Sequence, residues 1–188
     1  MLKGIQRTAK PGQRVRYLCQ DETRLGLKTV AGRLITACGV KPVGPTQWQR
    51  DCFWLYGVVE PLTGFSFFYE FSHLDSTCFQ TFLDLLSLQL GDDIAVIQLD
   101  QATAHTANKL VWPSNILLTF QPSHSPELNP IERFWLLLKK QLAWVNCADL
   151  EELRQRVASE LDKISPERIA SLTSYEFILE ALFGAALY

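Results

Sequence analysis

The sequence predicts an α/β fold in which helices cover both faces of one mixed sheet. Two observations lead to this prediction. Alternating and aromatic segments between residues 15 and 72 are typical of three antiparallel strands. Two short apolar segments, 94–100 and 116–120, each follow a helical pattern and are typical of parallel strands reached by right-handed crossovers.

Length and composition fit one globular domain of a cytoplasmic protein. The chain has 188 residues, 47% hydrophobic and 20% charged, and a net charge of −2. No global basic field indicates nucleic acid, although a local basic face remains compatible with this charge. The five cysteines are scattered without a CxxC pair, which argues against zinc ribbons and disulfide frameworks. We find no signal peptide, and the longest apolar run is too short to span a bilayer, so no membrane partner is expected.

The first three strands follow from alternation and turn chemistry. Val15–Glu22 alternates, and Asp21 ends its more apolar face. Its neighbour Glu22 is the rival candidate for a functional carboxylate, but alternation turns it to the opposite face. The aromatic segments 52–60 and 65–72 are joined by a Pro-Leu-Thr-Gly turn and predict a hairpin.

The later elements follow from caps and helical spacing. Asp75 and Ser76 predict the start of a helix that runs to Leu90 and stops at Gly91. A buried strand over 94–100 then ends on Asp100. We expect a short helix over 101–112, a strand over 116–120, and helices over 149–164 and from 165, followed by an apolar tail over 175–188.

The segment 121–140 switches from turn chemistry into a helix. Asn129 is predicted as the N-cap, Pro130 as the first helical residue, and Glu132 as the capping-box partner. Behind them an apolar stripe repeats at helical spacing, with Glu132 at its edge. Glu132 is therefore a cap residue at least.

Three carboxylates are expected to meet at one rim of the sheet. Asp21 and Asp100 end strands at the edge where open α/β sheets place their ligands, and the helix of Glu132 passes that edge. Such carboxylates repel one another unless a cation lies between them, and their oxygens select Mg²⁺ or Mn²⁺. The hypothesis is a two-metal nuclease site.

Three motifs carry a family resemblance. They are Gln20-Asp21-Glu22, Leu99-Asp100-Gln101-Ala102 followed by His105, and Ser125-Pro126-Glu127-Leu128-Asn129-Pro130-Ile131-Glu132 followed by Arg133-Phe134-Trp135. Together they resemble the catalytic domain of DDE transposases, in the bacterial insertion-sequence branch of the mariner superfamily. The resemblance implies an RNase H-like fold, Asp21, Asp100 and Glu132 as metal ligands, and DNA cleavage and strand transfer. It also implies DNA partners, at element ends and target, and a homodimer in the active complex.

Two departures keep alternatives open. Gln101 stands where the family usually has Asn, and residues 1–14 cannot hold the helix-turn-helix domains that precede the family's catalytic domain. We expect a separately encoded helix-turn-helix subunit to supply that part. The alternatives are a catalytically impaired relic that binds DNA or a partner subunit, and another RNase H-like nuclease.

The expected organisation has a lead-in and two further parts. Residues 1–14 form a flexible lead-in, 15–145 the catalytic domain with a loop insertion at 23–51, and 146–188 the C-terminal helices that pack on it. Candidate DNA-binding residues are Arg33, Lys41, Trp48, His105 and Lys139. For these the alternatives are a plain surface insertion for the loop, a structural role for His105 and a solvated Lys139.

Overall fold

Five strands form one mixed sheet in the order β3-β2-β1-β4-β5. The computed structural model describes residues 10–33, 35–41, 43–101, 109–123 and 125–186. Strands β1 (Val15–Gly26), β2 (Cys52–Val59) and β3 (Ser66–Phe71) form an antiparallel meander. Strands β4 (Ile94–Leu99) and β5 (Ile116–Phe120) continue the sheet in parallel with β1. The predicted mixture of three antiparallel and two parallel strands is confirmed.

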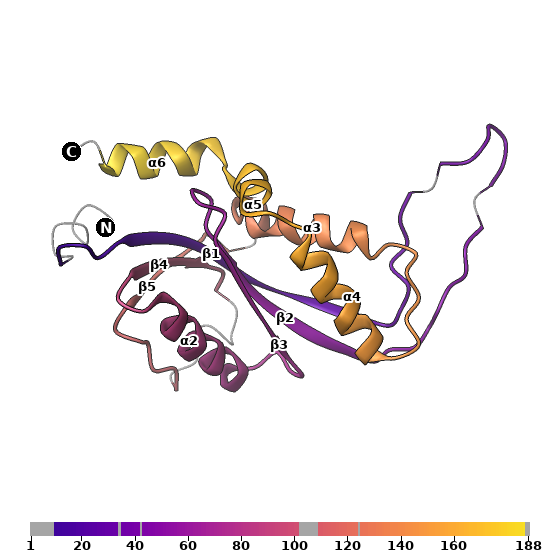
Figure 1. Ribbon diagram of the computed structural model, residues 1–188, viewed down its shortest axis with the longest axis horizontal. Helices are drawn as coiled ribbons and strands as arrows, with labels where there is room; N and C mark the ends of the chain where they lie inside the picture. The colour runs from indigo at the N-terminus through magenta and orange to yellow at the C-terminus, as the bar shows by residue number, and fades with distance from the viewer. Residues whose placement is uncertain (1–9, 34, 42, 102–108, 124, 187–188) are drawn as a thin grey trace.

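Helices cover both faces of this sheet (Figure 1). On one face lies α2 (Ser76–Leu90), whose Phe79, Phe82, Leu83 and Leu86 are buried against β1, β2 and β4. On the other lies α3 (Ile131–Gln141), preceded by the 3₁₀ turn η1 (Pro126–Leu128). Helices α4 (Leu150–Asp162) and α5 (Pro166–Thr173) pack beside α3, and α6 (Glu176–Ala186) ends the described chain. None of the helices in the described part is both long and apolar enough to cross a bilayer.

Local signals account for most helix ends. The carboxylate of Asp75 accepts hydrogen bonds from the backbone of Thr77 and Cys78, and Gly91 ends α2 with a φ of 59°. Ser165 caps α5 in the same way through the backbone N–H of Arg168. The helix predicted over 101–112 does not extend to its expected end, because Lys109–Trp112 is not helical. The rest of that prediction falls on residues 102–108, which lie outside the described part.

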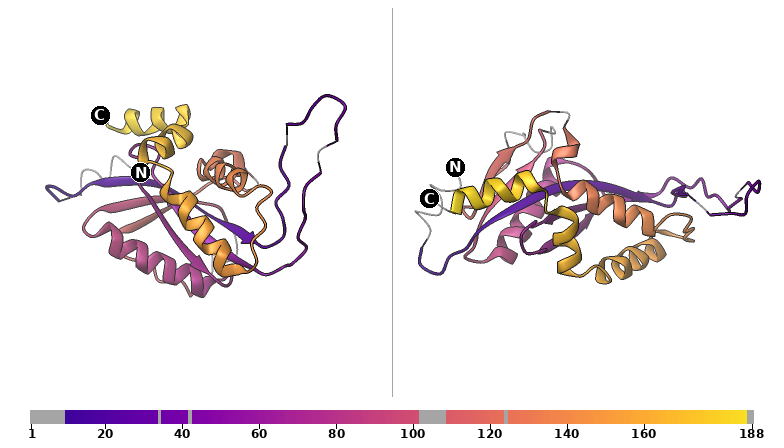
Figure 2. Two further views of the ribbon diagram at one scale, coloured as in Figure 1. Left: turned by 45° about the vertical axis from the view of Figure 1, so that its right-hand side comes forward. Right: turned by 90° about the horizontal axis from the view of Figure 1, so that it is seen from above.

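The first strand is longer than predicted and leads into a long arm. Strand β1 continues to Gly26, so the loop begins at residue 27 and the arm comprises residues 27–51. At its root the backbone N–H of Leu27 donates to Asp51 O at 3.0 Å, and that of Thr29 donates to Gln47 O at 3.1 Å. Beyond this short ladder the arm projects away from the sheet (Figures 1 and 2).

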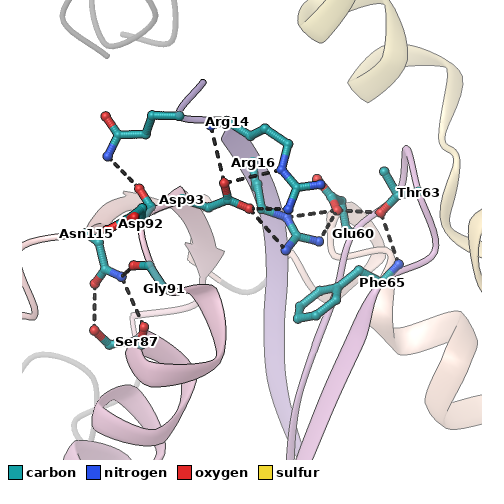
Figure 3. A network of polar contacts seen from close by, with 11 residues as sticks. Arg14, Arg16, Glu60, Thr63, Phe65, Ser87, Gly91, Asp92, Asp93 and Asn115 are labelled. Atoms are coloured by element: carbon teal, nitrogen blue, oxygen red, sulfur yellow. Dashed lines mark hydrogen bonds and ion pairs between the residues drawn. The ribbon is translucent and has the colours of Figure 1, made fainter. Parts of the chain in front are cut away.

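A partly buried ionic network closes the N-terminal ends of β1 and β4 (Figure 3). The guanidinium of Arg16 donates to Glu60 Oε2 at 2.7 Å and lies over the ring of Phe65, while Arg14 pairs with Asp93 at 2.7 Å. Since Arg16 and Glu60 are both almost fully buried, losing one partner would leave an uncompensated charge. The network therefore joins β1, the β2–β3 hairpin and the start of β4 at the end of the sheet opposite to Asp100.

Candidate active site

The pairing of β1 with β4 brings Asp21 and Asp100 level with each other. The parallel register runs from Val15 opposite Ile94 to Cys19 opposite Gln98. Continued by two residues, it places Asp100 opposite Asp21, just past the point where β4 ends at Leu99. Both carboxylates therefore follow the paired stretch of two adjacent strands by two residues.

Both aspartates belong to the face that α3 covers. On β1, Cys19 and Leu25 pack into the cluster under α3, so Asp21 shares their face by alternation. On β4, Ala95, Ile97 and Leu99 pack under α2, which assigns Asp100 to the opposite face. This agrees with the expectation that Asp21, rather than Glu22, faces the other candidate carboxylates.

Glu132 lies in the first turn of α3, within electrostatic reach of both aspartates. Burial, and then the charges of Glu22 and Glu132, raise the pKa of Asp21 to about 8. Burial likewise raises the pKa of Glu132; the charge of Asp100 adds to this effect, and Lys139 opposes it. Glu132 therefore interacts as a like charge with each of the two aspartates.

Trp135 connects α3 directly to Asp21. Its indole Nε1 donates to Asp21 Oδ2 at 3.0 Å, and its side chain is almost fully buried. The ring fits because Gly57, the residue opposite Asp21 on β2, has no side chain. A Cβ at Gly57 would lie 2.7 Å from Trp135 Cη2. A glycine inside a strand thus marks the close approach of the helix.

The predicted capping role of Asn129 is wrong. Helix α3 begins at Ile131 with Pro130 as its N-cap, and no side chain caps it. Instead, Asn129 Nδ2 donates to the backbone carbonyl of Gln20 at 2.8 Å, across to β1. The backbone carbonyl of Asn129 accepts from the N–H of Glu132 at 3.1 Å. Asn129 thus ties the start of α3 to the strand of Asp21, and Glu132 is no capping-box partner.

A set of glutamines holds the rim next to Asp100. Gln98 Nε2 donates to Gln121 Oε1 and to Leu128 O, both at 3.0 Å, and joins β4 to the segment before α3. Gln101 Nε2 donates to the backbone carbonyl of Gln121 at 3.2 Å. The residue that departs from the family's usual Asn is therefore used here to bridge the ends of β4 and β5.

The predicted DNA-binding residues are spread over the molecule. Arg33, Lys41 and Trp48 belong to the arm, and all three are exposed. Lys139 lies on α3, where its charge acts on Glu132. His105 lies outside the described residues.

The donor set is chemically suited to a hard divalent cation. All three side chains offer carboxylate oxygens, and the pKa of Asp21 is raised first by burial and then by the charges of Glu22 and Glu132, all of which a bound cation would offset. Among the described residues, no group of three or more His, Cys, Asp or Glu side chains is gathered closely enough to hold a metal ion. Asp21, Asp100 and Glu132 are thus brought within electrostatic range of one another rather than to ligand distance.

Two residues of this rim make contacts that the sequence does not predict. Asn129 is expected as a cap and Trp135 has no predicted polar role, yet the side chains of both donate hydrogen bonds to β1. Gly57 was the available signal for the contact of Trp135, since it interrupts an otherwise aromatic and β-branched strand.

Comparison with known proteins gives the same fold and a family. Structures of the Mos1 transposase superpose over most of the chain: a paired-end complex with the left transposon end (TM-score 0.65, 13% identity) and the mariner paired-end complex with Mn (TM-score 0.67, 14% identity). Each covers 92% of this chain, which spans 54% of theirs. The RNase H-like architecture expected from the sequence is thereby confirmed.

A curated relative is the uncharacterized protein y4pE/y4sA of Sinorhizobium fredii (strain NBRC 101917 / NGR234), 36% identical over 87 residues. The match covers 46% of this chain and 64% of that protein. A family model described as DDE superfamily endonuclease matches residues 16–154, from β1 into α4. This match covers the sheet and all three carboxylates, and the chain belongs to the DDE superfamily endonuclease family.

Proposed function

We propose that the chain is the catalytic domain of a transposase, which cuts DNA at element ends and joins the freed ends to target DNA. The observation that carries the proposal is the level placement of Asp21 and Asp100 on adjacent strands, with Glu132 acting on Asp21 from α3. Membership in the endonuclease family and the likeness to Mos1 complexes with transposon ends support DNA as the substrate.

We further propose that Asp21, Asp100 and Glu132 hold two Mg²⁺ or Mn²⁺ ions. When bound, such ions polarise the scissile phosphate and stabilise the attacking and leaving oxygens. The chain's own contribution is positioning: Trp135 orients the carboxylate of Asp21, and Asn129 fixes the start of α3 against β1. A homodimer and a separately encoded helix-turn-helix subunit complete the proposed active assembly.

The test is a cleavage and joining assay on DNA that carries the element's ends, with Mg²⁺ or Mn²⁺, and with and without the helix-turn-helix subunit. Asp100→Asn is expected to abolish the products, whereas Asp84→Asn, a change on exposed α2 surface, is expected to leave them unchanged. Absence of cleavage by the wild type in every condition would favour the alternative, a catalytically impaired relic that only binds DNA or a partner subunit. Cleavage of RNA instead of DNA would favour another RNase H-like nuclease.

A further inference from the structure

A basic cleft lies beside the candidate active site, between the root of the arm and the helices α3 and α4. It has a volume of about 550 Å³. Four cationic side chains line it, those of Arg24, Lys28, Arg50 and Lys139, against the single carboxylate of Asp51. This local excess of positive charge contrasts with the net charge of −2 for the whole chain.

The cations come from three separate elements that the fold brings together. Arg24 lies on β1, Lys28 and Arg50 lie on the two sides of the arm's root, and Lys139 lies in the last turn of α3. Arg24 is held in place, because its Nε donates to Cys52 Sγ at 3.0 Å and its Nη2 to Arg50 O at 3.4 Å. Lys28 Nζ lies 5.1 Å from the centre of the exposed Trp48 ring.

Within the described part of the chain, the ion pairs join other cations, chiefly Arg14, Arg16 and Arg154, to carboxylates. Asp51 lines the same cleft and the charge of Lys139 acts on Glu132, so two carboxylates offset the four cations in part. Cations in excess of nearby carboxylates repel one another, and an anionic ligand relieves that repulsion.

The floor of the cleft is apolar. Leu25, Leu142 and Leu153 line it beneath the cationic rim. A cationic rim over an apolar floor fits a ligand with anionic groups along one edge and less polar groups along the other. A nucleic-acid strand has this arrangement, with phosphates on one side and sugars and base faces on the other.

Lys139 joins the cleft to the carboxylates. It lines the cleft, and its charge acts on Glu132, seven residues earlier on the same helix. Seven helical residues span about 10 Å, which corresponds to about three nucleotides at a rise of 3.4 Å each. A strand bound at the rim therefore reaches the cleft within a few nucleotides.

We propose that this cleft binds the phosphodiester backbone of the DNA strand that leads away from the carboxylates. The inference rests on the proposed function for the identity of the ligand, and it adds Lys28 and Arg50 as backbone-binding residues. Phosphate contacts of this kind fix the register of the strand and carry no sequence information.

The test measures DNA binding in EDTA, so that cleavage does not contribute. A fluorescent DNA with a single-stranded end is titrated with the 188-residue chain at several salt concentrations. Lys28→Ala/Arg50→Ala is expected to reduce the slope of log K against log salt by about two, and Lys139→Ala by about one. Kd at 100 mM salt should rise about tenfold for each lost contact.

Lys140→Ala is the matched control, because this exposed lysine follows Lys139 on α3 and does not line the cleft. It should keep the wild-type slope. Equal slopes in all variants, equal losses in Lys140→Ala, or no DNA binding by the wild type at 50 mM salt would each overturn the proposal. So would polyglutamate bound as tightly as DNA at the same salt, because the cleft would then be selective only for charge.

The two proposals fail in distinguishable ways. Wild-type protein that binds DNA through the cleft but cuts nothing with Mg²⁺ or Mn²⁺ contradicts the proposed function alone. Protein that cuts DNA, and whose cleft variants bind and cut as the wild type does, contradicts only the inference about the cleft.

Discussion

Trp135 donates a hydrogen bond from its indole nitrogen to the carboxylate of Asp21, and Gly57 on the neighbouring strand leaves room for its ring. The bond joins α3 to β1 at the residue that family resemblance makes a metal ligand. It also lowers the pKa of Asp21 against the opposing effects of burial and of Glu22 and Glu132. Trp135 is therefore placed to orient this carboxyl group and to favour its ionised form, although burial dominates its pKa.

Trp135→Phe should weaken divalent metal binding by about ten- to a hundredfold, the usual effect of losing a partner that orients a ligand. The phenyl ring fills most of the space that the indole occupied, so the loss of metal affinity reports the missing N–H rather than a cavity. Mn²⁺ affinity is measured by calorimetry. Trp112→Phe is the control, because Trp112 packs on Phe79 under the other face of the sheet. An unchanged Mn²⁺ affinity in Trp135→Phe would show that the bond has no role in metal binding.

Gly57→Ala should destabilise the protein by about 1–3 kcal/mol, the usual cost of overpacking. The added Cβ would lie 2.7 Å from both Trp135 Cη2 and Phe68 Cδ1, so that the indole must move away from Asp21. Urea unfolding gives the free energy. Gly184→Ala in α6 is the control, because nothing lies within 4 Å of its added Cβ. It should be neutral or slightly stabilising; equal effects at both glycines would contradict the packing argument.

Without metal, the protein should lose stability as pH rises from about 4 to about 8. The pKa of Asp21 is about 8 in the folded chain against 3.8 as its ordinary value. In this window the folded state therefore holds a proton that the unfolded state has released, and stability falls by at most about 1.4 kcal/mol per pH unit for this group. Glu132, whose pKa is also raised, acts in the same direction.

The measurement is urea unfolding in EDTA at pH 5, 6, 7 and 8, for the wild type and for Asp21→Asn. The variant should show a shallower decline, since its side chain does not ionise. Adding Mn²⁺ at pH 8 should restore stability to the wild type and not to the variant, because the ion binds the folded state. Parallel declines in both proteins would exclude Asp21 as the source.

The parts of the fold that local chemistry dictates could be predicted from the sequence. Helix α2 begins after Asp75 and ends at Gly91 as expected, because N-caps and residues with positive φ contact only backbone groups within one helical turn. The strand over Ile116–Phe120 also matches the prediction, because an apolar run this short, bounded by Pro113 and Gln121, is too short for a helix. The carboxylates could be placed on one rim because each ends or begins an element.

What could not be predicted depends on partners distant in sequence. Asn129 is of a residue type that often caps helices, but its side chain donates a hydrogen bond to the backbone carbonyl of Gln20, 109 residues away. This tertiary contact overrides the local preference. The register that makes Asp21 level with Asp100 depends on sheet assembly. The cleft could not be predicted from the sequence, because its lining comes from β1, the root of the arm, α3 and α4.

Asn129→Ala should cost about 1–3 kcal/mol of stability and loosen the candidate site. Its amide is buried, and without it the carbonyl of Gln20 loses this donor in a buried place. The strand β4 offers no replacement, because its pairing with β1 ends at Cys19 and Gln98. The backbone bond from the N–H of Glu132 to the carbonyl of residue 129 is kept in the variant, so the change acts directly on the strand of Asp21 and reaches Glu132 only if the start of α3 shifts.

Urea unfolding measures the loss of stability, and Mn²⁺ affinity reports the geometry of the candidate site. The free energy of Mn²⁺ binding should fall by more than the free energy of unfolding. Asn146→Ala is the control, because Asn146 is exposed: its Nδ2 donates to Pro45 O at 3.2 Å and its Oδ1 accepts from Thr29 Oγ1, and on the surface a loss of at most about 0.5 kcal/mol is expected. If Asn129→Ala lost stability but bound Mn²⁺ as the wild type does, the tie between α3 and β1 would serve the fold alone. Weakened Mn²⁺ binding in Asn129→Ala and not in Asn146→Ala would instead assign Asn129 a role in positioning Asp21 and Glu132.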